Sequence, residues 1–564
     1  MASRQDNNIH SDWYEAVRDY TVRLAKVRSV SPGDGENRVA YEVLNLLCEG
    51  GLDTIYTTYG LDPLAEDPYK RHNAYGFLRG SSPATLILLG HIDTVDTKDY
   101  GSLEPLALDP EQLTTQQHLL WRQGTESGNG DDWLFGRGVA DMKSGVAINI
   151  ALLRRLAQRA QVEQLPLSIL LLATPDEENE SAGVLQAVHF LQRLQAQYQL
   201  DYLGVINTDY STELYPGDPH HYVYTGTVGK LLPGFLCIGR ESHVGMPFNG
   251  IDANLLAAEL IRDLSMNDEL CDRVRGQITA PPVTLHATDL KARYDVQLPF
   301  AAYFSLNVLT FHTDPRQLLT RLQDRAEQVL KRLLATIDET ERRWRFASQG
   351  SKQEHIQSRT GVVLTYAELY QNTVQHLSHA QVEAELNAEW ERWPAELDKR
   401  ERSLHLVHKL WTISGRQGPA VILYYAPPYY PHVAATPCVL QDAIAAVVQA
   451  HPETRLVQHE YFPYLSDLSY LRLDVGIDST ALKANMPVWQ DSMPGAPVRP
   501  GSYYLPLEAI QQLNIPVANF GVHGRGAHQR DECVAMSYSF GTLPQLLYET
   551  IEYLGNYSGS PSDG

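Results

Sequence analysis

Three consecutive acidic residues, Asp176, Glu177 and Glu178, stand just after the apolar run at 169–172. The run predicts a strand buried on both faces, so the three carboxylates would lie together at its end. Adjacent carboxylates repel one another unless cations or hydrogen bonds offset the repulsion. Such a cluster offers one group to hold a metal ion and a neighbouring group to move protons. A solvated acidic turn is the alternative interpretation of the same residues.

A second chemical signal is His91, which follows the apolar stretch 84–89 and is separated from Asp93 by one residue. In an extended segment, side chains two residues apart point the same way. Asp93 can therefore hold the imidazole of His91 in the orientation that a metal ion requires. A lone His-x-Asp triplet is weak support, because histidine also occurs as an ordinary structural residue.

Two further aspartates lie next to predicted elements of the same kind. Asp141 precedes an amphipathic helix, where free amide groups favour a carboxylate, so a helix cap is its ordinary role. Asp209 follows the apolar stretch 202–207, which predicts a third buried strand. Three such strands separated by helices indicate a parallel sheet with helices on its faces. Ligands of such sheets gather at the carboxyl ends of the strands, where His91, Glu178 and Asp209 would all lie.

The sequence pattern changes near residue 227 and returns to that of the first sheet after residue 430. We predict an α/β catalytic domain with a mostly parallel central sheet, built from 1–226 and 430–564. Residues 227–429 would form an inserted α+β domain with a ferredoxin-like order of strands and helices. Charge and helix-forming residues at about 340–410 predict a helical insertion within it, and the polar residues 101–133 predict a loop.

The bulk composition excludes several classes of protein. At 564 residues the chain exceeds what one hydrophobic core usually fills, and its formal charge of -22 disfavours nucleic acid and anionic membranes. Residues 1–13 lack an export signal, and no apolar run reaches the roughly 18 residues of a membrane span. Five scattered cysteines without a CxxC pair fit a reducing cytoplasm, so a metal would rely on histidine and carboxylate.

Six segments occur in order along the chain: GHIDTV, GRGVADMKSG, TPDEE, NTD, ESHVGMP and GAHQRDE. Together they resemble the di-zinc exopeptidase and deacylase family, which includes aminoacylase, glutamate carboxypeptidase, acetylornithine deacetylase and succinyl-diaminopimelate desuccinylase. The length and the segments PPYYP and FPYLSDLSYL look more like the family's RocB branch of arginine-utilisation proteins. The resemblance covers most of the chain except about 340–410. It implies a zinc-exopeptidase fold in which the inserted domain serves as a lid and dimerisation domain.

The resemblance also implies a ligand set for two Zn²⁺ ions. His91 and Asp209 would bind one ion, Glu178 and His528 would bind the other, and Asp141 would bridge the pair. Zinc accepts imidazole nitrogen and carboxylate oxygen, and two ions about 3.5–4 Å apart need a shared carboxylate. Co²⁺ or Mn²⁺ also suits such donors.

One ligand position has two candidates, and two further residues receive roles. His523 is the alternative to His528, which fits the closing segment of the family better. Glu177 adjoins a ligand without being one, so it would act as the general base. By resemblance, His243 would reach the active site of the partner subunit and stabilise the tetrahedral intermediate, which implies a homodimer. A loop histidine without a catalytic role is the alternative for His243.

We therefore expect a cytoplasmic, zinc-dependent hydrolase that cleaves an amide bond of a small N-acyl amino acid or short peptide in amino-acid or arginine catabolism. The family's arginine for a substrate carboxylate has no counterpart, because the comparable segment reads YYAPPYYPH. A non-catalytic binding protein with the same fold is one alternative. Hydrolysis of a phosphate ester is another, but it predicts basic or glycine-rich loops that these segments lack.

Overall fold

The computed structural model describes residues 2–65, 67–121, 132–349, 358–474, 476–491 and 499–558. The chain divides into two compact units. Unit 1 comprises Met1–Thr227, Val433–Leu473 and Pro506–Gly564, and unit 2 comprises Val228–His432 and Asp474–Leu505. The last of these segments differs from the sequence-based boundaries, which placed it in the catalytic domain. Its helix α12 (Ser479–Asn485) packs against the long helix and the sheet of unit 2.

Unit 1 is built on an eight-stranded sheet in the order β1-β2-β5-β3-β6-β16-β7-β15. The neighbouring strands β5, β3, β6 and β16 run parallel, so their carboxyl ends meet at one edge. Every residue of β3 and β5 is buried, as their continuous apolar runs predict. The strands are β1 (Thr58–Pro63), β2 (His72–Leu78), β3 (Ala84–His91), β5 (Ser168–Thr174), β6 (Asp201–Asn207), β7 (His221–Tyr224), β15 (Leu456–His459) and β16 (Val517–Asn519).

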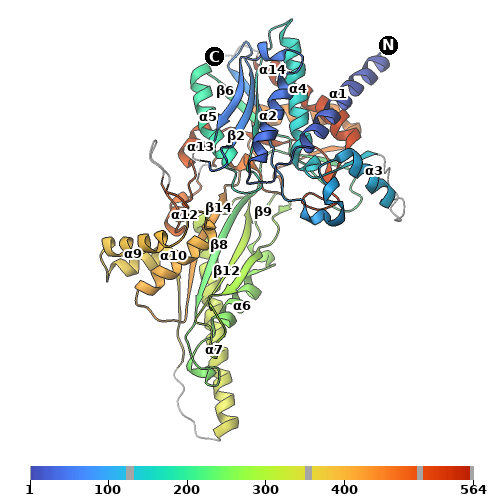
Figure 1. Cartoon of the computed structure of the whole chain (residues 1–564). Coiled ribbons are helices and arrows are strands. Elements are labelled where there is room, and N and C mark those ends of the chain that lie inside the picture. Colours follow the sequence, from blue (N-terminus) through green and yellow to red (C-terminus); the bar gives the residue numbers. More distant parts are fainter. Residues whose placement is uncertain are drawn as a thin grey trace. The chain divides into compact units, whose positions relative to one another are not determined.

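Five helices of unit 1, α1, α2, α4, α11 and α14, share one hydrophobic core with this sheet. In Figure 1, α14 lies beside α4 and α1, so the last helix described in the unit packs against the first. None of the helices that the structure describes, in either unit, is long and apolar enough to cross a membrane. The helices of unit 1 are α1 (Ala2–Ala25), α2 (Gly35–Cys48), α3 (Pro110–Trp121), α4 (Ser144–Ala160), α5 (Ala182–Tyr198), α11 (Val439–Ala450), α13 (Leu507–Leu513) and α14 (Leu543–Ser558).

The loop predicted at 101–133 is wrong for most of its described part. Helical turns at Lys98–Leu106 lead into α3, and a short strand β4 (Trp133–Phe135) follows, while 122–131 lies outside the described residues. A small core that includes Leu113 and Phe135 holds these elements together. The few apolar residues in a polar stretch gave too weak a periodicity to predict α3.

Unit 2 carries a five-stranded sheet in the order β11-β12-β8-β14-β13. Its elements β8, α6, β11, β12, α7 and β14 follow the predicted ferredoxin-like order. The predicted insertion is largely helical, but it also adds β13 to the sheet parallel to β14, and 350–357 lies outside the described residues. The elements are β8 (Gly229–Ile238), α6 (Ala253–Leu264), β11 (Val283–Asp289), β12 (Ala301–Thr310), α7 (Pro315–Gln349), β13 (Val362–Thr365), α8 (Tyr366–Val374), α9 (His379–Glu391), α10 (Lys399–Ile413) and β14 (Ala420–Tyr430).

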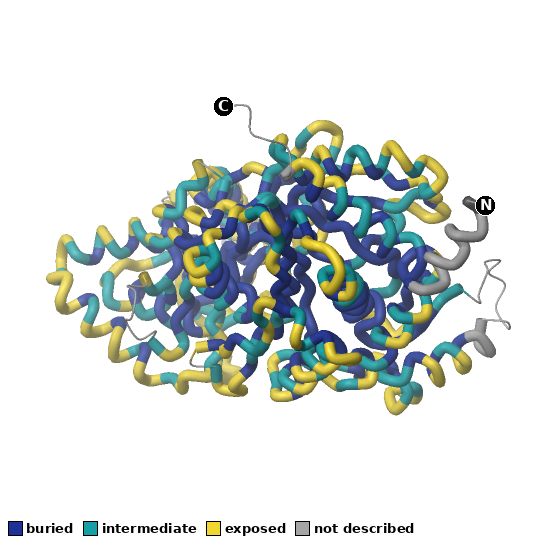
Figure 2. Tube along the Cα trace, turned by 90° about the horizontal axis from the view of Figure 1, so that it is seen from above, coloured by how far each residue is buried: buried dark blue, intermediate teal, exposed yellow. Residues whose placement is uncertain are grey.

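The outer helices have one buried face and one exposed face. In Figure 2 the outer coils alternate between dark blue, teal and yellow along their length, whereas the inner segments are mostly dark blue. This alternation is typical of amphipathic helices that cover a sheet. The core around the sheet of unit 1 is mostly apolar.

Candidate metal centre

The carboxyl edge of the parallel strands in unit 1 gathers the predicted metal ligands. Their ligand atoms form two groups, and within each group the atoms lie within 4.8 Å of one another. The first group is His91, Asp141 and Asp209, and the second is Asp141, Glu178 and His528. Asp141 belongs to both groups, so the two candidate ion positions share a carboxylate.

Asp141 presents one oxygen to each histidine. Its Oδ1 lies 2.9 Å from His91 Nε2, and its Oδ2 lies 3.1 Å from His528 Nε2. The alternative of a helix cap is wrong, because α4 begins at Ser144 with Lys143 in the capping position. Asp141 itself has the non-helical backbone angles φ -115° and ψ 95°.

A buried ion pair holds the backbone of Asp141 in place. Glu532 Oε1 accepts hydrogen bonds from the amides of Ala140 at 3.1 Å and Asp141 at 3.3 Å. Glu532 Oε2 accepts from Arg137 Nη1 at 2.7 Å, and both side chains of this pair are 1% exposed. Sequence reasoning assigned neither residue, although both lie inside the quoted segments. The segment GAHQRDE therefore contains the candidate ligand His528 and also Glu532, which holds the backbone of a second candidate ligand, Asp141.

Asp209 is positioned by a close backbone contact. A Cβ atom at Gly521 would lie 1.8 Å from the carbonyl oxygen of Asp209, so only glycine allows the chain after β16 to pass there. Asn519 Nδ2 donates a hydrogen bond to the same oxygen at 2.9 Å. The ends of β6 and β16 are thus fixed to each other where Asp209 leaves the sheet.

Asp93 contacts both the first histidine and the acidic turn. Its Oδ1 lies 3.5 Å from His91 Nδ1. Its two oxygens also accept hydrogen bonds from the amides of Glu177 at 3.2 Å and Glu178 at 2.9 Å. One buried carboxylate therefore links the imidazole of His91 to the backbone of the turn.

Glu177 lies beside the two groups without belonging to either. Its Oε2 is 4.0 Å from His91 Nε2. Burial raises the pKa of Glu177 well above its ordinary value; the charge of His91 opposes this rise, and nearby carboxylates, among them Asp467 and Glu178, add to it. A carboxyl group in such surroundings holds a proton more readily than one in water.

The electrostatics of the cluster fit a pair of divalent cations. Burial raises the pKa of Asp209 well above its ordinary value, and the charge of Asp141 adds to the rise. Burial opposes ionisation of Asp141, but hydrogen bonds from His528 and His91 hold its pKa well below its ordinary value. Contacts with Asp141 and Glu178 raise the pKa of His528 to about 11. Crowded, buried carboxylates of this kind require positive charge, and imidazole with carboxylate is a donor set that zinc accepts.

The other two predicted histidines lie outside both groups. His243 stands in an exposed turn of unit 2, where the amide of Gly245 donates to its Nδ1 at 3.0 Å. The ring of His523 packs edge-on against His221, with ring centres 4.8 Å apart. Of the two candidates for the last ligand, the structure therefore brings His528, and not His523, to Asp141.

Asp467 is a further buried carboxylate that the sequence analysis did not assign. It is 3% exposed, and its Oδ2 accepts a hydrogen bond from Thr174 Oγ1 at 3.1 Å. Burial raises its pKa to about 7. The only sequence signal was the polar segment SDLSY after an apolar stretch, which does not reveal that Asp467 meets the end of β5.

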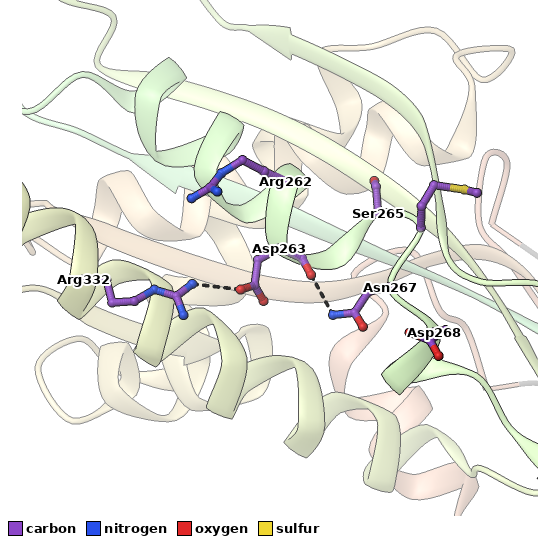
Figure 3. A pocket seen from close by; sticks show the side chains of 7 residues that line it. Arg262, Asp263, Ser265, Asn267, Asp268 and Arg332 are labelled. Atoms are coloured by element: carbon purple, nitrogen blue, oxygen red, sulfur yellow. Dashed lines mark hydrogen bonds and ion pairs between the residues drawn. The ribbon is translucent and has the colours of Figure 1, made fainter.

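A surface hollow in unit 2 has a different character. It has a volume of about 470 Å³ and contains none of the predicted site residues (Figure 3). Its arginines are already paired, because Arg332 contacts Asp263 at 2.8 Å and Arg262 contacts Glu259 at 2.6 Å. The hollow is lined by Arg262, Asp263, Ser265, Met266, Asn267, Asp268 and Arg332.

Comparison with known proteins places these observations in a family. The family described as "Peptidase family M20/M25/M40" matches residues 87–482. Protein RocB of Bacillus subtilis (strain 168) is 32% identical over 571 residues, which cover 97% of this chain and 96% of RocB. Uncharacterized protein YqjN of the same organism is 34% identical over 487 residues, covering 84% of this chain and 85% of YqjN.

More distant similarities agree with this assignment. Succinyl-diaminopimelate desuccinylase of Wolinella succinogenes is 28% identical over 222 residues, which cover 37% of this chain and 52% of that enzyme. The solved structure of aminopeptidase PepT from Bacillus cereus has a TM-score of 0.50 at 12% identity, covering 96% of this chain and 98% of PepT. The predicted resemblance to this group of exopeptidases and deacylases, and to RocB, is confirmed.

Proposed function

Because the chain belongs to peptidase family M20/M25/M40, we propose that it hydrolyses an amide bond of a small N-acyl amino acid or short peptide with two divalent metal ions. The observation that carries the proposal is Asp141, whose two oxygens lie 2.9 Å from His91 and 3.1 Å from His528. A carboxylate with one oxygen toward each half of a site suits the bridging position between two cations.

Each ion would take ligands from one of the two groups. His91 and Asp209 would hold one ion, Glu178 and His528 the other, and Asp141 both. Zinc is our first choice, and Co²⁺ or Mn²⁺ also fits these donors. When bound, the ions would polarise the scissile carbonyl and lower the pKa of water toward neutrality.

Glu177 would handle the proton of the reaction. Its carboxylate would accept a proton from the attacking water and deliver it to the leaving nitrogen, so that the products are an acid and an amine. Burial, which raises the pKa of Glu177, helps the carboxyl group to keep that proton between the two transfers. Asp93 would hold the ring of His91 and the amide of Glu177 in fixed positions relative to each other, because it contacts both.

We also propose that two copies of the chain associate through unit 2. Strand β11 stands at the edge of its sheet, and two of its apolar residues are largely exposed, Leu285 at 59% and Val283 at 43%. An exposed edge strand with apolar side chains favours pairing with another strand. In such a dimer, His243 of one chain would serve the active site of the other.

We also propose a substrate class and a location in the cell. From the resemblance to the RocB branch we propose a role in amino-acid or arginine catabolism, so arginine and ornithine derivatives belong in a substrate screen. A cytoplasmic location is supported by the five unpaired cysteines. A screen of acylated amino acids and dipeptides, with and without a chelator, would also separate an enzyme from a non-catalytic binding protein, which binds metal but releases no product.

The decisive variant is Glu177→Gln, which keeps the volume of the side chain and removes its basicity. It should bind metal like the wild type, because Glu177 belongs to neither ligand group, while hydrolysis falls by roughly 10²- to 10⁴-fold. Glu180→Gln, in the same turn, is the matched control and should retain activity. Undiminished turnover in Glu177→Gln would remove the residue from its role, and a wild-type chain that binds no metal would refute the metal-dependent reaction.

A further inference from the structure

Beside the acidic turn, one buried arginine is shared by three carboxylates. Arg71 precedes β2, and its side chain is 5% exposed. Its Nε and Nη2 donate to Asp67 at 3.0 and 2.7 Å, and its Nη1 donates to Glu36 at 3.2 Å and to Asp176. The side chains of these three acids are between 0 and 5% exposed. The reaction proposed above uses none of them.

Asp176 connects this arginine to the residues that follow it, Glu177 and Glu178. Asp176 has a φ of +75°, a left-handed conformation that few residues other than glycine adopt, so its surroundings must hold it there. Its carboxylate accepts from the amide of Ala182 at 3.1 Å as well as from Arg71. On the far side of the turn, Asp93 holds the amides of both glutamates.

Charge gives Arg71 its particular importance. Burial raises the pKa of Glu36 to about 8, the charge of Asp93 adds to the rise, and Arg71 opposes it. Without this guanidinium, several buried carboxylates would lie close together with no cation between them. The turn would then have to rearrange so that water or another donor could reach the carboxylate of Asp176.

We propose that Arg71 is a positioning residue of the metal centre, which fixes the directions of Glu177 and Glu178 by holding Asp176. The inference rests on the function proposed above. Glu178 belongs to only one of the two ligand groups, whereas His91 and Asp209 belong to the other. Loss of Arg71 should therefore weaken one ion site selectively. A merely structural ion pair predicts no such selectivity.

The test is a titration of the metal-free, full-length protein with Co²⁺, followed by visible absorption and calorimetry. The wild type should bind two ions per chain. Arg71→Met should bind one ion normally and the second roughly 10- to 100-fold more weakly, as observed when groups that orient metal ligands are removed. Arg71→Lys keeps the charge but loses the planar fork of donors, so it should restore part of the second site.

Arg193→Met is the matched control, because it also removes an arginine that pairs with a largely buried carboxylate. Arg193 pairs with Asp62 at 2.6 Å in the same unit, and Asp62 has 10% of its side chain exposed. Among the residues that the structure describes, neither Arg193 nor Asp62 forms a hydrogen bond or ion pair with the acidic turn. This variant should bind two Co²⁺ ions with wild-type affinities.

A second readout is turnover when both sites are saturated with Co²⁺. Because Glu177 moves together with Glu178, kcat of Arg71→Met should fall more than KM changes. If Arg71→Met does not fold, Asp176→Asn carries the test, since it removes the charged acceptor at nearly the same volume and should show the same selective loss. Wild-type Co²⁺ affinities and kcat in a folded Arg71→Met or Asp176→Asn, or an equal loss in the control, would overturn the inference. A wild-type chain without Co²⁺ binding would instead refute the proposed function itself.

Discussion

The buried pair of Arg137 and Glu532 allows a quantitative prediction about how the backbone of Asp141 is held. We consider Glu532→Gln, which changes one atom of the side chain. The carbonyl oxygen of glutamine can still accept from the amides of Ala140 and Asp141, but its amide nitrogen cannot accept from Arg137. One charge-assisted hydrogen bond of 2.7 Å is lost, between side chains that are each 1% exposed.

The expected magnitude follows from what remains around Arg137. A hydrogen bond to a charged group contributes about 1.5–3 kcal/mol. Arg137 keeps Asp99 as a carboxylate partner at 2.6 Å, which limits the further cost of leaving its charge buried. We therefore expect unit 1 to lose about 3 kcal/mol of stability. The thermal midpoint should fall by roughly 1.5 °C per kcal/mol for a unit of this size.

The assay combines urea unfolding with hydrogen exchange of the peptide that contains Ala140 and Asp141. Exchange of these amides should accelerate by about two orders of magnitude, because 1.36 kcal/mol corresponds to a factor of ten. The control is Glu549→Gln, which removes the acceptor of a partly exposed pair with His451 at 2.6 Å and should cost less than about 1 kcal/mol. Equal losses in the two variants, or unchanged exchange at 140–141, would refute the reasoning.

Three further predictions concern metal, pH and association. Removal of metal with a chelator should lower the thermal midpoint of the protein, and Zn²⁺ at 100 times its Kd should restore about 2.7 kcal/mol of stability. The restored stability should be smaller in His528→Ala at the same Zn²⁺ concentration. A thermal midpoint that does not depend on metal in calorimetry would contradict this prediction. Burial opposes ionisation of Asp272, but hydrogen bonds from Thr313 and neighbouring amides hold its pKa below the ordinary value. The stabilisation by this carboxylate is therefore present above pH 4 and is lost as pH falls. The difference in urea stability between wild type and Asp272→Asn should shrink toward pH 3, and a constant difference would be evidence against this prediction. Leu285→Lys should shift the protein from dimer to monomer in light scattering, whereas Leu214→Lys, at a residue 49% exposed in unit 1, should not; a dimeric Leu285→Lys would exclude the β11 edge as the interface.

The central sheet can be predicted from the sequence because its inner strands are continuous apolar runs. Strands β3 and β5 are buried along their whole length, so each appears as an unbroken apolar run that ends in a polar residue. Because the carboxyl ends of parallel strands meet at one edge of a sheet, these runs predict that His91 and Glu178 lie near each other. By contrast, α3 contributes only to a small satellite core, and its weak apolar pattern predicts a loop instead of a helix.

The supporting residues of the site could not be predicted in this way. Arg137 and Glu532 are 395 residues apart, and the sequence around each residue does not indicate which residue it pairs with. Arg71 stands in a polar turn, where an arginine is ordinarily exposed, and only the fold shows that it is buried among acids. Periodicity reports which face of an element is apolar, but it does not report which charges meet across the core.

The separation of the candidate ligands along the chain has a consequence for synthesis. His528 meets Glu178 across 350 residues, and the whole first segment of unit 2 lies between them. A nascent polypeptide that has not yet been translated past this histidine lacks one side of the cluster, however well its first strands have formed. The polar centre can therefore be completed only after His528 has been translated, and chains that terminate before this residue cannot assemble it.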